Sequence, residues 1–406
     1  MKEQASDHSE RLRHRAVFFL PGFDPAPLRQ HRERYRREGA AQAAISGYEL
    51  DVIGSDAGGW NVVSTQDGQA VTARIEVLEW RDIVARHMRG GPLWSYWLLL
   101  RTAWIYISSG ALWRLARLRK GPVLAVLYPV LMLLGQAALA LGLGALAGQV
   151  ILAGAKLLFV GASTGSFAAL TIGALITWSV LRWFKRHDGR FLAHYLMRDF
   201  AYAASAQGAY PEELETRLDA FAERIAAADA DEVLLVGHSS GAYLAISLLA
   251  DLRRRGLGGR LALLTLGHVV PMVSFLPDAT RLRADLAALS IDHGITWLDV
   301  GAPGDGCSFA LCDPVAVSGV AEPQKFWPLV RSAAFRQTLS PECRQALRWR
   351  FFRLHFQYLC AFDQPGEYDY FRLTAGPLPL AARIADWQPS RTRIERPLSG
   401  YRSQAA

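Results

Sequence analysis

Charge is almost absent from one long stretch of this sequence, and cysteines and metal-binding patterns are scarce throughout its 406 residues. Between Gly121 and Leu181 the only charged residue is Lys156, although the chain carries a formal net charge of +8. The four cysteines form no CxxC pair, which favours reduced thiols over a disulfide framework or a cysteine metal site. The sequence also has no HExxH, Walker or dinucleotide glycine pattern, so we expect no metal and no cofactor.

The uncharged stretch contains two segments, 122–144 and 157–181, that are each long enough to cross a hydrocarbon core of roughly 30 Å. A buried helical hairpin is the alternative, but the absence of charge on every helix face favours membrane insertion. Basic residues flank the outer ends of the pair, which predicts that both flanks face the cytoplasm. We therefore expect a multi-pass membrane protein of the bacterial inner membrane type, with its main domain cytoplasmic. The N-terminal residues lack the apolar run of a signal peptide.

Aromatic residues concentrate in residues 92–120, where four tryptophans lie among leucines. Such residues prefer the headgroup region of a bilayer, so we expect one interfacial helix there, with a core helix of the soluble domain as the alternative. The basic residues lie beside the apolar spans and in the mixed-charge segment LRQHRERYRRE, residues 28–38. This distribution predicts that the partner is the lipid bilayer and not nucleic acid.

Short apolar strands alternate with helical patterns on both sides of this insertion. We expect strands at 16–20, 60–64, 71–80, 233–236, 260–266 and 295–300, and helices at 29–44, 211–228 and 241–255. This alternation predicts an α/β fold in which a mostly parallel sheet, covered by helices on both faces, is interrupted by an inserted transmembrane helical hairpin. The expected parts are a charged tail (1–15), the first part of the sheet domain (16–90), the membrane insertion (91–190), the second part (191–388) and a flexible tail (389–406).

One motif points to chemistry, the turn Gly237-His238-Ser239-Ser240-Gly241 between an apolar strand and a helix. It fits the G-x-S-x-G pattern in the context that the pattern requires. A strand that turns directly into a helix crowds the residues two before and two after the apex, so glycines are needed there. The apex residue is strained and presents its hydroxyl above the sheet. Ser239 is therefore the nucleophile candidate. The alternatives are a small-residue turn and a register slip to Ser240.

A serine nucleophile needs a base and an acid that orients the base, and in this architecture the chain order is Ser, Asp/Glu, His. Asp305 follows the strand at 295–300 on a Gly/Pro-rich loop and is the expected acid, with Asp313 as the alternative. His355 lies after it and is the expected base, with His268 as the second choice.

The oxyanion of the reaction needs two backbone donors. One is the amide of Ser240, which follows the nucleophile. The other is expected in the loop after the first strand, where Gly22 allows close approach and Phe23 supplies the amide.

These features resemble the α/β-hydrolase superfamily, and loosely its lipase and esterase branches. The resemblance rests on FFLPGF (18–23), VLLVGHSSGAYLA (233–245), LLTLG (263–267) and the order of Asp305 and His355. LLTLG is followed here by His-Val-Val-Pro, where lipases of the fungal type usually have a small residue and proline.

The resemblance implies acyl transfer through a covalent ester, in which Ser239 attacks a carbonyl carbon, His355 moves the proton and Asp305 orients His355. The expected function is a membrane-anchored serine hydrolase that cleaves lipid-like carboxylic esters. The alternatives are an acyltransferase or thioesterase with the same triad, and a non-catalytic membrane scaffold.

Overall fold

The computed structural model describes residues 11–56 and 58–405, which form two compact units. One unit contains the chain up to Ala85, the segment Ser109–Pro122 and everything from Ser205 onward. The other contains Arg86–Ser108 and Val123–Ala204. The second unit overlaps the predicted insertion (91–190) but extends beyond it at both ends, and residues 109–122 belong to the first unit. Residues 1–10 of the predicted N-terminal tail lie outside the described residues.

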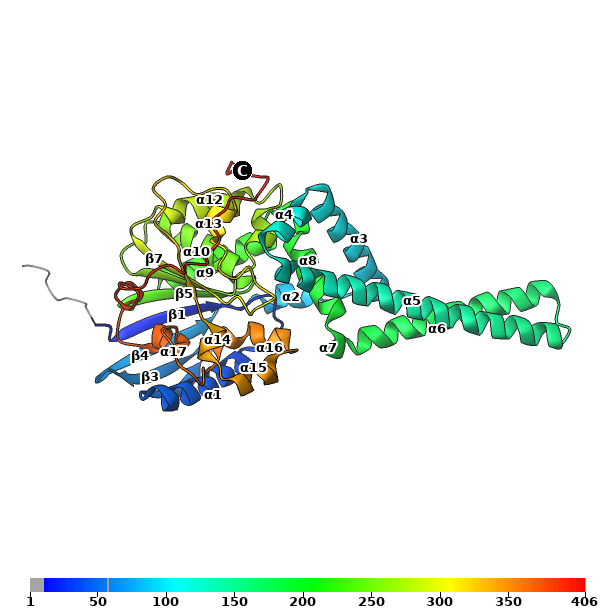
Figure 1. The fold of residues 1–406 in the computed structure, drawn as a ribbon, viewed down its shortest axis with the longest axis horizontal. Coiled ribbons are helices and arrows are strands. Elements are labelled where there is room, and N and C mark those ends of the chain that lie inside the picture. The colour runs from blue at the N-terminus through cyan, green and yellow to red at the C-terminus, as the bar shows by residue number, and fades with distance from the viewer. Residues whose placement is uncertain (1–10, 57, 406) are drawn as a thin grey trace, which may run out of the picture. The chain divides into compact units, whose positions relative to one another are not determined.

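An eight-stranded sheet forms the centre of the first unit, in the order β2-β3-β4-β1-β5-β6-β7-β8 (Figure 1). The strands are β1 (His14–Leu20), β2 (Glu49–Asp56), β3 (Gly59–Gln66), β4 (Gln69–Val77), β5 (Glu232–His238), β6 (Leu261–Leu266), β7 (Ile295–Gly301) and β8 (Leu329–Ser332). Neighbouring strands from β4 to β8 run parallel, whereas β3 is antiparallel to both β2 and β4. The predicted mostly parallel α/β sheet is confirmed. The sequence did not predict β2, which has many polar residues, or β8, which has only four residues.

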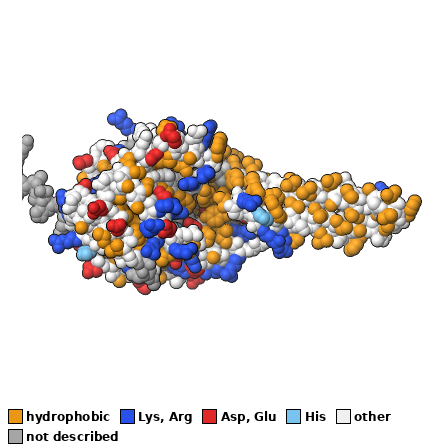
Figure 2. Space-filling view, turned by 90° about the horizontal axis from the view of Figure 1, so that it is seen from below, with side chains coloured by type: hydrophobic (Ala, Val, Ile, Leu, Met, Phe, Trp, Pro, Cys, Tyr) orange, Lys and Arg blue, Asp and Glu red, His pale blue; other side chains and the backbone are white. Residues whose placement is uncertain are grey.

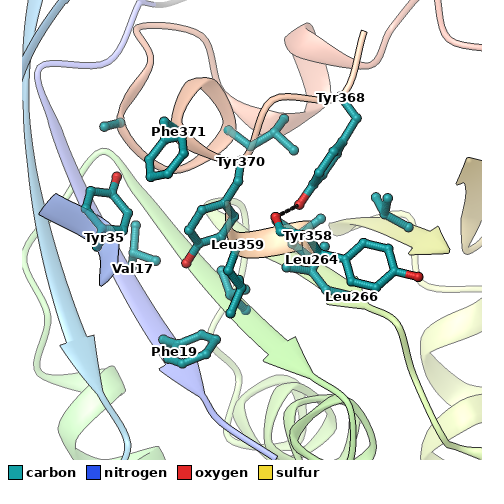
Figure 3. Packing of buried hydrophobic residues seen from close by; sticks show 14 of the residues in the cluster. Val17, Phe19, Tyr35, Leu264, Leu266, Tyr358, Leu359, Tyr368, Tyr370 and Phe371 are labelled. Carbon is teal, nitrogen blue, oxygen red and sulfur yellow. Dashed lines mark hydrogen bonds between the residues drawn. The ribbon is translucent and has the colours of Figure 1, made fainter. Parts of the chain in front are cut away.

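Helices cover both faces of this sheet (Figure 1). The longer helices are α9 (Glu212–Ala226), α10 (Gly241–Arg254) and α12 (Thr280–Ser290) on one face and α1 (Leu28–Ser46) on the other. Shorter ones are α2 (Arg81–His87), α4 (Ala111–Leu118), α11 (Pro271–Ser274), α13 (Pro314–Val317), α14 (Phe335–Thr338), α15 (Pro341–Leu347), α16 (Phe351–His355), α17 (Tyr370–Ala375) and α18 (Leu380–Arg383). On the α1 face, Val17, Tyr35, Leu264 and Phe371 belong to one buried cluster that joins sheet and helices (Figure 3).

The middle of the sheet positions the candidate site. β1 and β5 are neighbours, and the chain leaves them in opposite directions, through α1 towards β2–β4 and through α10 towards β6. In an open parallel sheet, ligands bind at the carboxyl ends of strands whose connections diverge in this way. Leu20 pairs with Gly237, so the loops that follow β1 and β5 meet at this edge.

The second unit is helical and contains α3 (Pro92–Ser108), α5 (Lys120–Leu157), α6 (Ala162–Arg186), α7 (Asp188–Phe191) and α8 (Ala193–Ala203). α5 and α6 lie side by side as an antiparallel hairpin (Figure 1). The Thr177 hydroxyl donates to the Ala140 carbonyl at 3.2 Å. A Cβ placed on Gly144 would lie 2.5 Å from the carbonyl oxygen of Gly173, so the two backbones approach closely where both residues are glycine.

Both hairpin helices are long and apolar enough to cross a membrane. At 1.5 Å per residue, α6 is about 37 Å long, which exceeds a hydrocarbon core of roughly 30 Å. Only 22% of the most apolar window of each helix is buried, whereas a core helix of a soluble protein would be mostly buried. On the face drawn in Figure 2, hydrophobic side chains lie along the whole length of the hairpin.

The expected boundaries of two helical segments differ in the structure. α5 continues past residue 144 to Leu157, because the glycines of this segment do not stop the helix and the chain turns only around Phe159. The helix expected over 92–120 is interrupted at Gly110, whose φ of 71° is left-handed and ends the helical path between α3 and α4.

The C-terminal segment, which we expected to be flexible, packs along the first unit. The amides of Ser390, Ile394 and Leu398 donate to the carbonyls of Val330, Leu311 and Val317, respectively, at 2.7–3.0 Å. These backbone hydrogen bonds hold the segment in place even though its Arg- and Ser-rich composition suggested mobility.

Candidate active site

Ser239 lies at the apex of the turn between β5 and α10, with a left-handed φ of 59°. This conformation costs a non-glycine residue about 1–2 kcal/mol, so the surrounding structure must hold it. A Cβ on Gly237 would lie 2.6 Å from the Ala242 Cα, and one on Gly241 would lie 2.7 Å from the Pro21 carbonyl oxygen. Both flanking glycines are therefore required by the close approach that the motif predicted.

His355 ends α16 and pairs with Asp305, which lies on the loop after β7. The His355 Nδ1 and the Asp305 Oδ2 are 2.8 Å apart, and both residues are at least 95% buried. This hydrogen bond requires a proton on Nδ1 when the carboxyl is ionised, which leaves Nε2 free to accept a proton. The structure thus brings together the predicted base and the predicted acid.

Asp305 is held as an acceptor by three donors. Besides His355, the Tyr358 hydroxyl donates to Oδ2 at 3.1 Å and the Cys307 amide donates to Oδ1 at 2.9 Å. Burial acts to raise the pKa of Asp305, but the nearby His355 imidazole and the hydrogen bonds from His355 and the Cys307 amide hold that pKa below its usual range. The acid is therefore ionised at neutral pH. The sequence analysis did not identify Tyr358. This residue lies three positions after His355 in a helical stretch, and that spacing places two side chains on the same face of a helix.

The side chain of His238, within the motif itself, connects the turn to the base. Its ring packs on the His355 ring at a centroid distance of 4.7 Å, and its Nε2 donates to the His355 carbonyl at 2.9 Å. Burial, together with the neighbouring His355, lowers the pKa of His238 to about 3, so it is neutral at pH 7. Since Ser239 is the next residue along the chain, this contact joins the turn to the end of α16 at His355. In the described part of the chain, no hydrogen bond joins the Ser239 hydroxyl to His355, and Ser239 is only partly buried.

The alternative acid and base are engaged elsewhere. Asp313 caps α13 by accepting from the amides of Val315 and Ala316, and it pairs with the Lys325 ammonium at 2.6 Å. The His268 Nε2 donates to the Cys312 carbonyl at 2.9 Å, and its Nδ1 accepts from the Val270 amide at 3.3 Å. With both ring nitrogens of His268 occupied, it has no lone pair free to accept a proton from serine.

The loop after β1 reaches the turn as expected. A Cβ on Gly22 would lie 3.1 Å from the Ser239 Cβ, so only glycine fits easily there. The Phe23 amide, expected as an oxyanion donor, donates to the Ser240 hydroxyl at 2.8 Å. The Ser240 side chain therefore holds this loop, a role that the sequence did not suggest.

No group of three or more His, Cys, Asp or Glu side chains in the described ranges is placed to hold a metal ion. Comparisons of the chain with family models, with curated proteins and with solved structures each find no match. The interpretation of this site therefore depends on its geometry.

Proposed function

We propose that this protein is a membrane-anchored serine hydrolase of the α/β-hydrolase type that cleaves carboxylic esters through an acyl-enzyme. The observation that carries the proposal is the buried His355–Asp305 hydrogen bond beside the strained Ser239 turn. In this mechanism, Ser239 attacks the carbonyl carbon while His355 Nε2 accepts the hydroxyl proton. His355 then donates that proton to the leaving alcohol, and water releases the acyl group by the same steps.

The order of strands supports this reading of the turn. β1 and β5 are central neighbours, and the loops that follow them supply Gly22 and Ser239 at one edge of the sheet. The backbone amides of Ser240 and Phe23 are the proposed oxyanion donors. Phe23 can serve in this role once the Ser240 hydroxyl turns away from its amide.

The exposed apolar surface of the second unit supports lipid-like esters as the substrates. Besides the hairpin, helix α3 has an apolar face at spacings of three and four residues, which is exposed in the structure. Leu93, Trp97, Leu100, Trp104 and Ile107 on this face are each at least 49% exposed. Tryptophan at this density suits the bilayer interface, so we propose that α3 lies at the headgroup level and that the sheet unit works at the cytoplasmic surface.

A non-catalytic scaffold is the second candidate, and one contact favours it. The hydrogen bond from the Phe23 amide to the Ser240 hydroxyl uses one of the two proposed oxyanion donors. If this bond is permanent, the oxyanion receives only one backbone donor, which costs about 10²–10³ in rate.

Hydrolysis of a short p-nitrophenyl ester by the detergent-extracted full chain tests the proposal. We expect Ser239→Ala and His355→Ala to abolish turnover, because they remove the nucleophile and the base. His268→Gln should retain it, because the ring nitrogens of His268 hydrogen-bond backbone groups and its Nε2 lies 3.7 Å from the Asp299 carboxylate. Ser403→Ala controls for loss of an exposed serine. Turnover that survives in well-folded Ser239→Ala would contradict the proposal, and an inactive folded wild type would favour the scaffold.

A further inference from the structure

A short loop of the first unit exposes two aromatic rings. It consists of residues 348–353, Arg-Trp-Arg-Phe-Phe-Arg, and connects α15 to the first residues of α16. We call it the arginine-aromatic loop. Trp349 is 75% exposed, more than any other tryptophan in the part of the chain that the structure describes, and Phe351 is 52% exposed. The centroids of these two rings are 6.3 Å apart, so they form one exposed apolar patch.

Both ends of this loop are fixed to the protein core. Leu347, just before it, belongs to the large buried cluster beside the sheet, and Leu354, just after it, packs against that cluster. The Arg350 amide donates to the Leu347 carbonyl at 2.9 Å, and the Leu354 amide donates to the Arg350 carbonyl at 2.9 Å. These contacts hold the loop in a conformation that leaves Trp349 and Phe351 outside the core.

Three exposed arginines, Arg348, Arg350 and Arg353, flank the two rings. The Arg348 guanidinium lies 5.1 Å from the centroid of the Trp349 ring. Within the described ranges, none of the three guanidinium groups forms an ion pair with a carboxylate. Segment 341–356 as a whole contains four arginines and one glutamate. The loop therefore combines uncompensated positive charge with exposed aromatic surface.

Other exposed arginines of the first unit have their charge balanced within the protein. Arg36 on α1 pairs with Glu33 at 2.6 Å, and Arg255 after α10 pairs with Asp219 at 2.9 Å. The charge of the arginine-aromatic loop has no such partner, so it is available to anions outside the protein.

We propose that the arginine-aromatic loop docks on the surface of an anionic lipid bilayer. Tryptophan prefers the headgroup region, and clustered arginines are attracted to the phosphates of anionic lipids. The loop supplies both groups on one surface. The same chain contains two helices that are long and apolar enough to cross a membrane, so a bilayer is the anionic surface to which the loop is tethered.

The loop is next to the proposed base. α16 begins inside it at Phe351 and ends at His355, whose Nδ1 pairs with Asp305. Docking of the loop therefore places the helix that carries the base at the headgroup level. The inference rests on the membrane anchor of the proposed function but not on its chemistry.

Hydroxyl-radical footprinting of the full chain tests this contact, because it measures the accessibility of individual side chains. The chain is incorporated into nanodiscs of phosphatidylcholine alone, or of equal parts phosphatidylcholine and phosphatidylglycerol. We expect oxidation of Trp349 and Phe351 to fall at least fivefold in the discs with phosphatidylglycerol. Phe326 is the internal control and should change less than twofold. It is 56% exposed, and its amide donates to the Ser290 carbonyl near the amino end of β7, at the opposite edge of the sheet.

Two variants separate the role of charge from that of the rings. Arg348→Gln/Arg350→Gln keeps both rings and removes two positive charges, so the effect of phosphatidylglycerol should fall below twofold. The matched control Arg255→Gln/Arg260→Gln removes two exposed charges before the amino end of β6 and should keep the fivefold effect.

Each outcome decides the inference. Equal oxidation of Trp349 and Phe351 in both kinds of nanodisc would show that the loop does not bind anionic lipid. Protection in detergent that grows with protein concentration would assign the loop to a second copy of the chain instead. Protection by a single-stranded oligonucleotide but not by phosphatidylglycerol would assign it to nucleic acid. A chain that does not enter nanodiscs would contradict the membrane anchor and the inference with it. Protection by phosphatidylglycerol in a chain that does not react with a fluorophosphonate would support the docking surface and remove the hydrolase.

Discussion

Replacing Asp305 by asparagine is the most informative single change, because it keeps the shape of the side chain and removes its charge. The Cys307 amide can still donate to the remaining oxygen. On the other side, the new NH₂ group would face the His355 Nδ1 and the Tyr358 hydroxyl, which both donate to Oδ2 in the wild type. His355 must then accept at Nδ1 and carry its proton on Nε2. That tautomer cannot take a proton from Ser239.

The size of the effect follows from this change of tautomer. The variant loses the base and the carboxylate that stabilises the imidazolium, and in serine hydrolases the equivalent change costs about 10⁴ in rate. We expect a loss of 10³–10⁴, which corresponds to about 4–5.5 kcal/mol in the barrier. The folded state loses one hydrogen bond to a charged group, about 1.5–3 kcal/mol, so the protein should remain folded.

The assay is the second-order rate of fluorophosphonate reaction, measured beside the thermal midpoint in the same detergent. Asp313→Asn is the matched control. It weakens a helix cap and an ion pair, so it should lower the midpoint and leave the reaction rate within threefold. A folded Asp305→Asn protein that reacts within tenfold of wild type would refute the reasoning, and so would a 10³-fold loss in the control.

Two further predictions concern stability. Burial raises the pKa of Asp299 to about 6, above its ordinary value, so its contribution to stability is fully present below about pH 4. About 3 kcal/mol of the free energy of unfolding is lost as the pH rises from about 4 through 6. Asp299→Asn should therefore raise the thermal midpoint at pH 8 more than at pH 4.5. If the gain is equal at both pH values, the pKa is not shifted. Gly144→Val should lower the midpoint of the hairpin in detergent, because Gly144 faces Gly173 closely, whereas Gly142→Val meets nothing within 4 Å and should not. Equal effects of the two valines would contradict the packing.

The turn and its surroundings could be predicted from the sequence because the constraints there are local. A strand, two glycines at fixed offsets and a helix together determine how the chain passes the apex, and the structure has a left-handed Ser239 between two glycines without room for a Cβ. The alternation of apolar strands and helices likewise predicted a mostly parallel sheet.

Other features depend on contacts between distant segments, which no local pattern contains. His268 and His355 are both buried, and only the hydrogen-bond partners distinguish the backbone link of His268 from the Asp305 pair. The contact between Ser240 and the Phe23 amide joins residues far apart in the chain. The central place of β1 arises because the chain returns past it after β4, and no residue in β1 itself indicates that order.

In the helical hairpin, too, one feature could not be predicted from local sequence. Its apolar composition was clear, but the position of the turn was not, since glycines occur both inside α5 and at the turn. The chain turns where Phe159 takes a left-handed conformation. Which glycines support close helix contact and which simply lie on the outer surface follows from the pairing with α6.

The most direct test of the central claim is to locate the covalent adduct after fluorophosphonate treatment of the full chain. Intact mass should increase by one phosphonyl group, and peptide mapping should place it on Ser239, with no adduct in Ser239→Ala. An adduct on Ser240 or on another serine, or no adduct on a folded protein, would contradict the assignment of Ser239 as a nucleophile.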